Sequence, residues 1–219
     1  MMRTENEPAT RARRGRGRWP RSTRRVVSGA FIGVGAVLLL GAGASVARGA
    51  LARDAARAEW AALEAQRAAR GARLTVQRGE GWVARRGAPV ARLVIPRLTL
   101  DEIVVEGVGD AELRAGPGHM TGSAVPGDAG NSVISAHRDR HFRSLGRLVV
   151  GDTIVTESDR GRVTWTVSDV RVVGAEAPAL RATTTPRLTL TTCWPIRYFG
   201  PAPERLILTA SPVARVETN

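Results

Sequence analysis

The feature that most constrains this chain is a run of 22 residues without a charge, from Val26 to Ala47. About 20 consecutive apolar residues are enough for a helix to cross the hydrocarbon core of a bilayer. Nine arginines lie upstream, between Arg3 and Arg25, and basic flanks favour the cytoplasmic side of a membrane. The sequence therefore predicts a basic cytoplasmic tail at 1–25 and a single-pass anchor at 26–47 in the inner or plasma membrane, with the later residues outside the cytoplasm.

A cleaved signal peptide is the alternative interpretation of the same run. The small residues Ser45, Val46 and Ala47 stand where a cleavage site would lie. The run is longer than the apolar core of about 7 to 15 residues that is usual for a signal peptide, which favours the anchor. Both interpretations send the rest of the chain out of the cytoplasm.

The positive charge of the chain is unevenly distributed. The net charge is +13, and all 33 basic residues are arginine, which excludes a lysine base or a lysine Schiff base. Residues 1–48 carry ten arginines against two acids, residues 49–89 carry eight against four, and residues 90–219 carry fifteen against fourteen. With only 4% aromatic residues for base stacking and a C-terminal part close to neutral, nucleic acid is not expected as a partner.

Residues 48–89 are predicted to connect the anchor to the C-terminal part. Within them, 49–70 is rich in alanine, and the spacing of Leu51, Ala55, Trp60 and Leu63 predicts a weakly amphipathic helix. Gly71 would end this helical stalk, and the segment rich in arginine and glycine at 71–89 is typical of a linker.

From residue 90 onward the pattern changes to short apolar runs that are separated by turn residues. Residues of high strand propensity fill seven such runs: 91–95, 100–108, 131–136, 152–157, 162–173, 187–192 and 204–210. The connections are too short for helical crossovers, which favours a mostly antiparallel sheet or closed barrel. We expect 90–219 to be a single all-β domain.

The only cysteine, Cys193, ends one of these runs. It has no disulfide partner in the chain and cannot form a cysteine zinc cluster. A cysteine nucleophile needs a nearby imidazole or guanidinium, because a free thiol is mostly protonated at pH 7. His137 follows another predicted strand and Arg205 opens a third. Taken one at a time, each has an ordinary alternative: a buried structural cysteine, a surface histidine and a surface arginine.

Together these residues resemble the sortase family. The run Thr189-Leu-Thr-Thr-Cys193 is similar to the family's TLxTC signature, and the segments Gly127–Asp139 and Phe142–Asp152 and the pair Trp194-Pro195 also match. The resemblance covers residues 90–219 and is strongest to class D sortases and their Gram-negative relatives, which have a run like His137–Phe142. Departures are Ala136, where many members have glycine, and Arg140, where threonine is common.

The resemblance implies a closed β-barrel of about eight strands with short helices. It also implies a cysteine transpeptidase with His137, Cys193 and Arg205 as catalytic residues and with no cofactor. Such an enzyme cleaves an LPxTG-like sorting signal between Thr and Gly and joins the Thr to an amine. The implied partners are surface proteins with a C-terminal sorting signal and an amine acceptor, either a peptidoglycan stem peptide or a protein.

Five further residues are weaker candidates for the site. His119, Thr191, Thr192 and Trp194 are expected to line the substrate groove, although His119 is equally well explained as a loop histidine and the threonines as ordinary strand residues. Asp139 is expected to support the turn after His137 or to orient a neighbouring arginine. We expect no metal site from the H-x-D-x-H spacing of His137, Asp139 and His141, because no other cluster of ligands accompanies it.

Two other functions fit parts of the pattern. An extracytoplasmic cysteine protease would form the same acyl-enzyme and pass it to water. A non-enzymatic anchored β-domain would bury Cys193 as a structural residue. The first differs from a transpeptidase in the acceptor, and the second predicts slow labelling of the thiol, independent of His137.

Overall fold

A computed structural model describes residues 21–70, 84–177 and 183–213 of the chain. The chain divides into two compact units, Met1–Ser45 and Val46–Asn219. Most of the predicted basic tail and most of the predicted linker at 71–89 lie outside the described residues. The predicted β-domain at 90–219 falls within the second unit.

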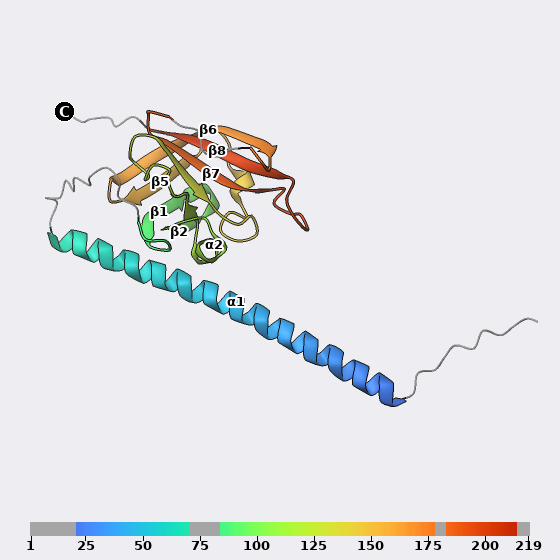
Figure 1. Ribbon diagram of the computed structural model, residues 1–219. Helices are drawn as coiled ribbons and strands as arrows, with labels where there is room; N and C mark the ends of the chain where they lie inside the picture. The colour runs from blue at the N-terminus through green and yellow to red at the C-terminus, as the bar shows by residue number, and fades with distance from the viewer. Residues whose placement is uncertain (1–20, 71–83, 178–182, 214–219) are drawn as a thin grey trace, which may run out of the picture. The chain divides into compact units, whose positions relative to one another are not determined.

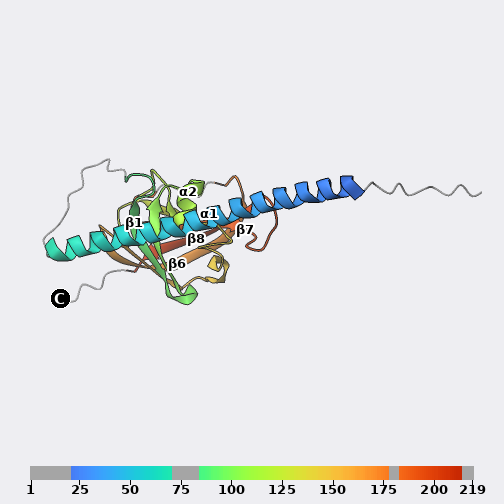
Figure 2. The same cartoon turned by 90° about the horizontal axis from the view of Figure 1, so that it is seen from below.

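Helix α1, Arg21–Arg70, is 50 residues long and is drawn as one continuous helix in Figures 1 and 2. Between Ala30 and Ala69 it contains an 18-residue window of mean hydropathy 2.1, long and apolar enough to cross a membrane. Phe31 and Leu39 in this window are 73% and 75% exposed. Contiguous exposed apolar side chains are unfavourable in water and are typical of a surface that contacts lipid or protein. The predicted apolar N-terminal helix is confirmed.

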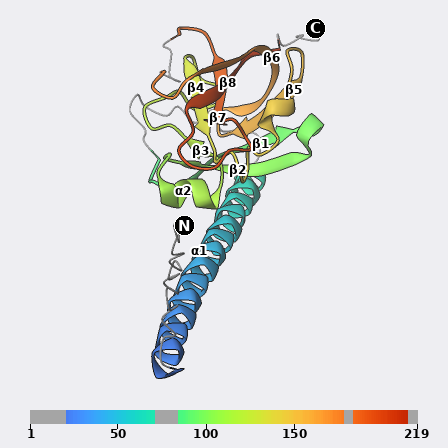
Figure 3. The same ribbon diagram turned by 90° about the vertical axis from the view of Figure 1, so that its right-hand side faces the viewer.

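The second unit contains a closed barrel of eight strands (Figure 3). The strands are β1 (Pro89–Ile95), β2 (Leu100–Glu106), β3 (Gly118–His119), β4 (Asn131–Ser135), β5 (Thr153–Ser158), β6 (Gly161–Gly174), β7 (Arg187–Trp194) and β8 (Glu204–Pro212). Their order is β1-β2-β3-β4-β7-β8-β6-β5, and the pairing of β5 with β1 closes the barrel. The short helices are α2 (Asp110–Ala115) and the 3-10 turns η1 (Pro96–Leu98) and η2 (Leu145–Arg147). The predicted all-β barrel is confirmed.

The barrel encloses one main core, to which inward-facing residues of every strand except β3 contribute. Trp165 on β6 is fully buried, and its indole N–H donates to Thr156 Oγ1 at 2.8 Å, so the polar edge of the ring is satisfied inside the barrel. Phe142 and Leu145, which follow β4, close the same core. The segment after His137 is therefore held by packing even though it is not a strand.

A second apolar cluster joins the C-terminal part of α1 to the outer face of β2. Ala56 and Trp60 pack with Ile103 and Val105, and all four are buried. The predicted apolar face is confirmed for Trp60 but not for Leu51, which is 68% exposed, nor for Ala55, which is also exposed. Leu51 lies nine residues before Trp60, about two and a half turns, and therefore on the opposite side of the helix. Within the second unit, residues 46–70 are thus a docked helix.

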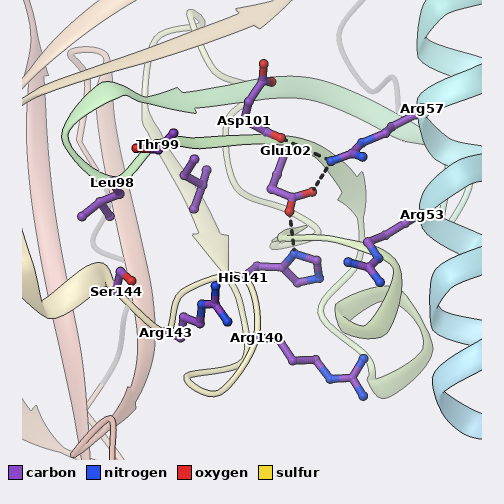
Figure 4. Close-up of a pocket in the computed structure, with 11 residues that line it drawn as sticks. Arg53, Arg57, Leu98, Thr99, Asp101, Glu102, Arg140, His141, Arg143 and Ser144 are labelled. Atoms are coloured by element: carbon purple, nitrogen blue, oxygen red, sulfur yellow. Dashed lines mark hydrogen bonds and ion pairs between the residues drawn. The ribbon is translucent and has the colours of Figure 1, made fainter. Parts of the chain in front are cut away.

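Beside this cluster, Glu102 of β2 contacts the side chains of His141 and Arg57 (Figure 4). Its carboxylate lies 3.2 Å from Nδ1 of His141 and 3.3 Å from a terminal nitrogen of Arg57. Burial by itself raises the pKa of Glu102, but the hydrogen bond from His141 and the charges of His141, Arg57 and Arg53 outweigh it. The net pKa of Glu102 lies below its ordinary value of 4.5.

We expect Glu102→Gln to destabilise the protein at neutral pH but not in acid. A carboxyl with a lowered native pKa stabilises the fold above its unfolded pKa, and this contribution is lost as the pH falls through the native pKa. The melting temperature should fall by about 2–4 °C at pH 7, as for a loss of about 1 kcal/mol in a chain of this size. The difference from wild type should shrink below pH 4.5. Thermal unfolding followed by circular dichroism measures this. Asp139→Asn is the matched control, and an equal loss at both pH values would contradict the prediction.

Candidate functional site

Strand β7 lies between β4 and β8, and this arrangement brings the three predicted catalytic residues together. Cys193 near the end of β7 is the cross-strand partner of Arg205 at the start of β8. On its other side β7 runs parallel to β4, with Ser135 opposite Thr191. β4 ends at Ser135, so His137 follows the end of β4 by two residues, as Cys193 follows Thr191 by two residues on β7. Residues 56 and 12 positions away from Cys193 in the sequence therefore lie at the same end of the sheet.

The three side chains also share one face of the barrel wall. Successive side chains of a strand alternate between its two faces. The interior is occupied by the even-numbered residues of these strands: Ile134, Ala136, Leu188, Leu190, Leu206 and Leu208. The odd-numbered His137, Cys193 and Arg205 therefore belong to the outer face.

Cys193 is the one residue of β7 that is exposed. Cys193 is exposed, whereas Thr189 and Thr191 before it on the same face are buried. Thr192 points inward, and its hydroxyl donates to the carbonyl of Ala136 at 2.7 Å, which ties the end of β7 to the residue before His137. An exposed thiol next to a cationic strand neighbour is the setting in which cysteine acts as a nucleophile.

Arg205 is oriented by the segment that follows β6. Its Nε donates to the carbonyl of Ala175 at 2.7 Å. Ala175 is itself fixed, because its N–H donates to the carbonyl of Pro203 at 3.1 Å. A guanidinium has five donors in a planar fork. With Nε occupied, its terminal nitrogens remain for a group bound beside Cys193.

The turn after His137 is stabilised by backbone groups. The His137 carbonyl accepts from the N–H of Arg140 at 3.3 Å and of Phe142 at 3.2 Å. Asp139, predicted to support this turn, is exposed and has no hydrogen bond or ion pair with any described residue. The expected support from the Asp139 side chain is therefore not found among the described residues, because backbone hydrogen bonds close the turn.

Arg138 is a residue of this site that sequence reasoning missed. Its guanidinium donates to the carbonyls of Tyr198 at 3.0 Å, Gly200 at 2.9 Å and Pro195 at 3.4 Å. It also lies over the ring of Tyr198, 5.6 Å from its centroid. Arg138 thus clamps the β7–β8 loop, which begins directly after Trp194. The only signal in the sequence was its position next to His137.

Trp194, the residue after Cys193, is held in place by packing. It is half-buried and packs against the main core. A β-carbon at Gly146 would lie 2.9 Å from its ring, so the indole rests directly on the backbone of η2. The Trp194 side chain therefore packs between the end of β7 and η2.

His119 lies in a different environment from the predicted groove. It is in β3 and only 3% exposed. Its Nδ1 is 2.7 Å from Glu106, and its Nε2 is 2.9 Å from both Ser123 Oγ and the Ala124 carbonyl. Thr121 donates to the second oxygen of Glu106 at 2.7 Å. The loop and groove interpretations are both corrected: His119 and Glu106 form a buried polar pair that is satisfied within the barrel.

Among the described residues, no group of three or more His, Cys, Asp or Glu side chains is placed to hold a metal ion. His141, which shares the H-x-D-x-H spacing with His137 and Asp139, pairs with Glu102 instead.

Comparison with known proteins identifies the family. A family model described as the sortase domain matches residues 93–213. The chain belongs to the sortase family. It is 33% identical over 118 residues to sortase D of Bacillus subtilis (strain 168), a match that covers 53% of this chain and 60% of that relative. The predicted resemblance is confirmed.

Solved sortases share the fold. The sortase D5 transpeptidase of Clostridium perfringens is similar with a TM-score of 0.54 at 23% identity, over 60% of this chain and 82% of that one. Sortase C-1 of Actinomyces oris gives a TM-score of 0.52 at 30% identity, over 57% of this chain and 74% of that one. These matches place the barrel of this chain among sortase barrels.

Proposed function

We propose that this sortase is a membrane-anchored cysteine transpeptidase in which Cys193 is the nucleophile, His137 the general acid and base, and Arg205 the stabiliser of the oxyanion. The observation that carries the proposal is the register of three neighbouring strands. The register pairs Cys193 with Arg205 and aligns the end of β4, which His137 follows, with the end of β7; this supports a site made of all three. Membership of the sortase family supports the assignment.

In the first half of the reaction, the Cys193 thiol gives its proton to His137, and the thiolate attacks the carbonyl carbon between Thr and Gly of an LPxTG-like signal. A carbon–sulfur bond forms, and the electron pair of the carbonyl moves to its oxygen. The terminal nitrogens of Arg205, with the charge that arginine always carries, stabilise this oxyanion. The His137 imidazolium then protonates the glycine nitrogen, the carbon–nitrogen bond breaks, and a thioester remains on Cys193.

In the second half, an amine acceptor attacks the thioester carbonyl. His137 takes a proton from the attacking nitrogen, the thiolate of Cys193 leaves and is reprotonated, and a new amide joins the Thr to the acceptor. The exposed position of Cys193 supports access for two peptide-sized substrates in succession. If water replaces the amine, the same steps give a protease.

The proposed substrates are surface proteins with a C-terminal sorting signal, and the proposed acceptor is a peptidoglycan stem peptide or a protein amine. The apolar stretch of α1 supports a single membrane-spanning anchor. The arginines that precede it support an orientation with the N-terminus in the cytoplasm and the barrel outside.

The test uses the full chain in detergent micelles with a library of LPxTG-like peptides and a glycine or diamino nucleophile, analysed by mass spectrometry. We expect a new amide between Thr and the amine, absent with Cys193→Ala. Product with a free Thr carboxylate only, even at high amine concentration, would identify a protease. No Cys193-dependent product across the library, together with slow alkylation of the thiol, would favour the non-enzymatic β-domain.

A further inference from the structure

The molecule has a recessed site between the N-terminal helix and the turn after His137, and its lining does not include Cys193 (Figure 4). It is a cavity of about 510 Å³ within the second unit. Its lining combines residues 53 and 57 of α1, residues 98–102 at the start of β2, and residues 140, 141, 143 and 144 of the turn. Four of the lining residues are arginines, Arg53, Arg57, Arg140 and Arg143, against the two acids Asp101 and Glu102.

The acids of this cavity already have cationic partners. Asp101 is bound by Arg92 at 2.6 Å, and Arg92 is not part of the lining. Glu102 is bound by His141 and Arg57. Among the described residues, the guanidinium groups of Arg53, Arg140 and Arg143 form no ion pair or hydrogen bond, although the charge of Arg53 acts on Glu102 from a distance. Three guanidinium groups thus border one cavity without an ion-paired acid of their own, and Figure 4 shows them arranged around the ring of His141.

Like charges around a common cavity repel one another, so the cavity favours an anion that bridges them. The planar fork of arginine matches the oxygens of phosphate and binds them through two parallel hydrogen bonds. We propose that this cavity binds a phosphate-bearing anion through Arg53, Arg140 and Arg143. Nothing in the sortase reaction proposed above uses these residues.

The position of the cavity along α1 favours the phosphate of a lipid headgroup as the source. A β-carbon at Gly49 would lie 3.4 Å from a terminal nitrogen of Arg140, so this guanidinium sits against the helix only two residues after Ala47, where the charge-free run ends. An α-helix rises about 1.5 Å per residue, so Arg53 lies about 9 Å beyond Ala47 along the helix axis. The polar headgroup layer of a bilayer extends about 5–8 Å outside the hydrocarbon on each side, so Gly49 lies within it and Arg53 at its outer edge. Only this choice of source rests on the proposed anchor.

The test measures binding rather than activity. The full chain is purified in a neutral detergent and titrated by calorimetry with glycerol 3-phosphate. In a second arm, native mass spectrometry counts phosphatidylglycerol molecules that stay bound to it. The variant is Arg53→Gln/Arg143→Gln, which breaks no ion pair within the described residues. The control is Arg162→Gln/Arg187→Gln, which removes two positive charges outside the cavity.

We expect the double cavity variant, but not the control, to bind the phosphate compound or the lipid about tenfold or more weakly. A loss confined to phosphatidylglycerol assigns the site to a lipid headgroup, and a loss for glycerol 3-phosphate as well assigns it to soluble phosphates. Equal binding by wild type, variant and control, or equal losses in both variants, would overturn the proposal. Cys193→Ala should bind like wild type, so failure of the proposed transpeptidation would leave this result unchanged.

Discussion

Replacing Arg205 with lysine is expected to lower kcat about 100- to 1,000-fold, the loss typical of removing one donor to a developing oxyanion. In the structure, Nε of Arg205 is held by the Ala175 carbonyl at 2.7 Å, which leaves the terminal nitrogens for the oxyanion. A lysine ammonium is a single point on a flexible stem. It cannot keep the Ala175 contact and serve the oxyanion at once. Lysine keeps the positive charge beside Cys193. The variant therefore tests whether catalysis needs the planar geometry of the guanidinium in addition to its charge.

The measurement is steady-state formation of the amide product with a peptide that wild type accepts. Arg162→Lys, which makes the same change at an exposed position of β6, serves as the control. Because the fork acts on charge that appears only in the transition state, KM should change much less than kcat. A lysine variant with more than a third of the wild-type kcat would remove Arg205 from the oxyanion role.

The architecture of the barrel was largely predictable from the sequence, since its longer strands each carry a run of β-branched and apolar residues. The strand that escaped prediction is β3, which has only the two residues Gly118 and His119. Its pairing parallel to β2 and antiparallel to β4 depends on distant backbone, not on its own composition. A segment of two residues shows no periodicity, and so no local signal identifies it.

The site was predictable where a residue ends or opens a strand, and not where a contact joins distant loops. His137, Cys193 and Arg205 stand at such strand ends, and the register then brings them together. The pair of His119 and Glu106 depends on the parallel register of β2 and β3, which pattern alone does not show. The role expected for Asp139 is not found for a different reason. A charged residue in a turn suggests that its side chain stabilises the turn, but backbone hydrogen bonds already do so here.

Replacing Arg138 with glutamine is expected to lower kcat/KM about 10- to 100-fold, as small misplacements of reacting groups do. Arg138 donates to three carbonyls of the β7–β8 loop, 57 to 62 residues away in the sequence. Glutamine is too short and has too few donors to hold them. The loop begins at Pro195, two residues after Cys193, and ends at β8, which starts with Glu204 and Arg205. Loosening it changes the spacing between the thiol and the guanidinium.

Arg138 acts through the loop and does not touch the reacting atoms in this scheme, so it is a positioning residue. Its test therefore needs a readout of the loop itself. Hydrogen exchange of backbone amides in 196–203 should become faster in Arg138→Gln, while exchange in β1 and β5, on the far side of the barrel order, stays unchanged. Arg197→Gln removes the same charge from an exposed position on the loop and should leave exchange and kcat/KM near wild type. If activity falls while loop exchange stays constant, Arg138 acts directly on the substrate, because a clamp cannot be lost without freeing the segment it holds.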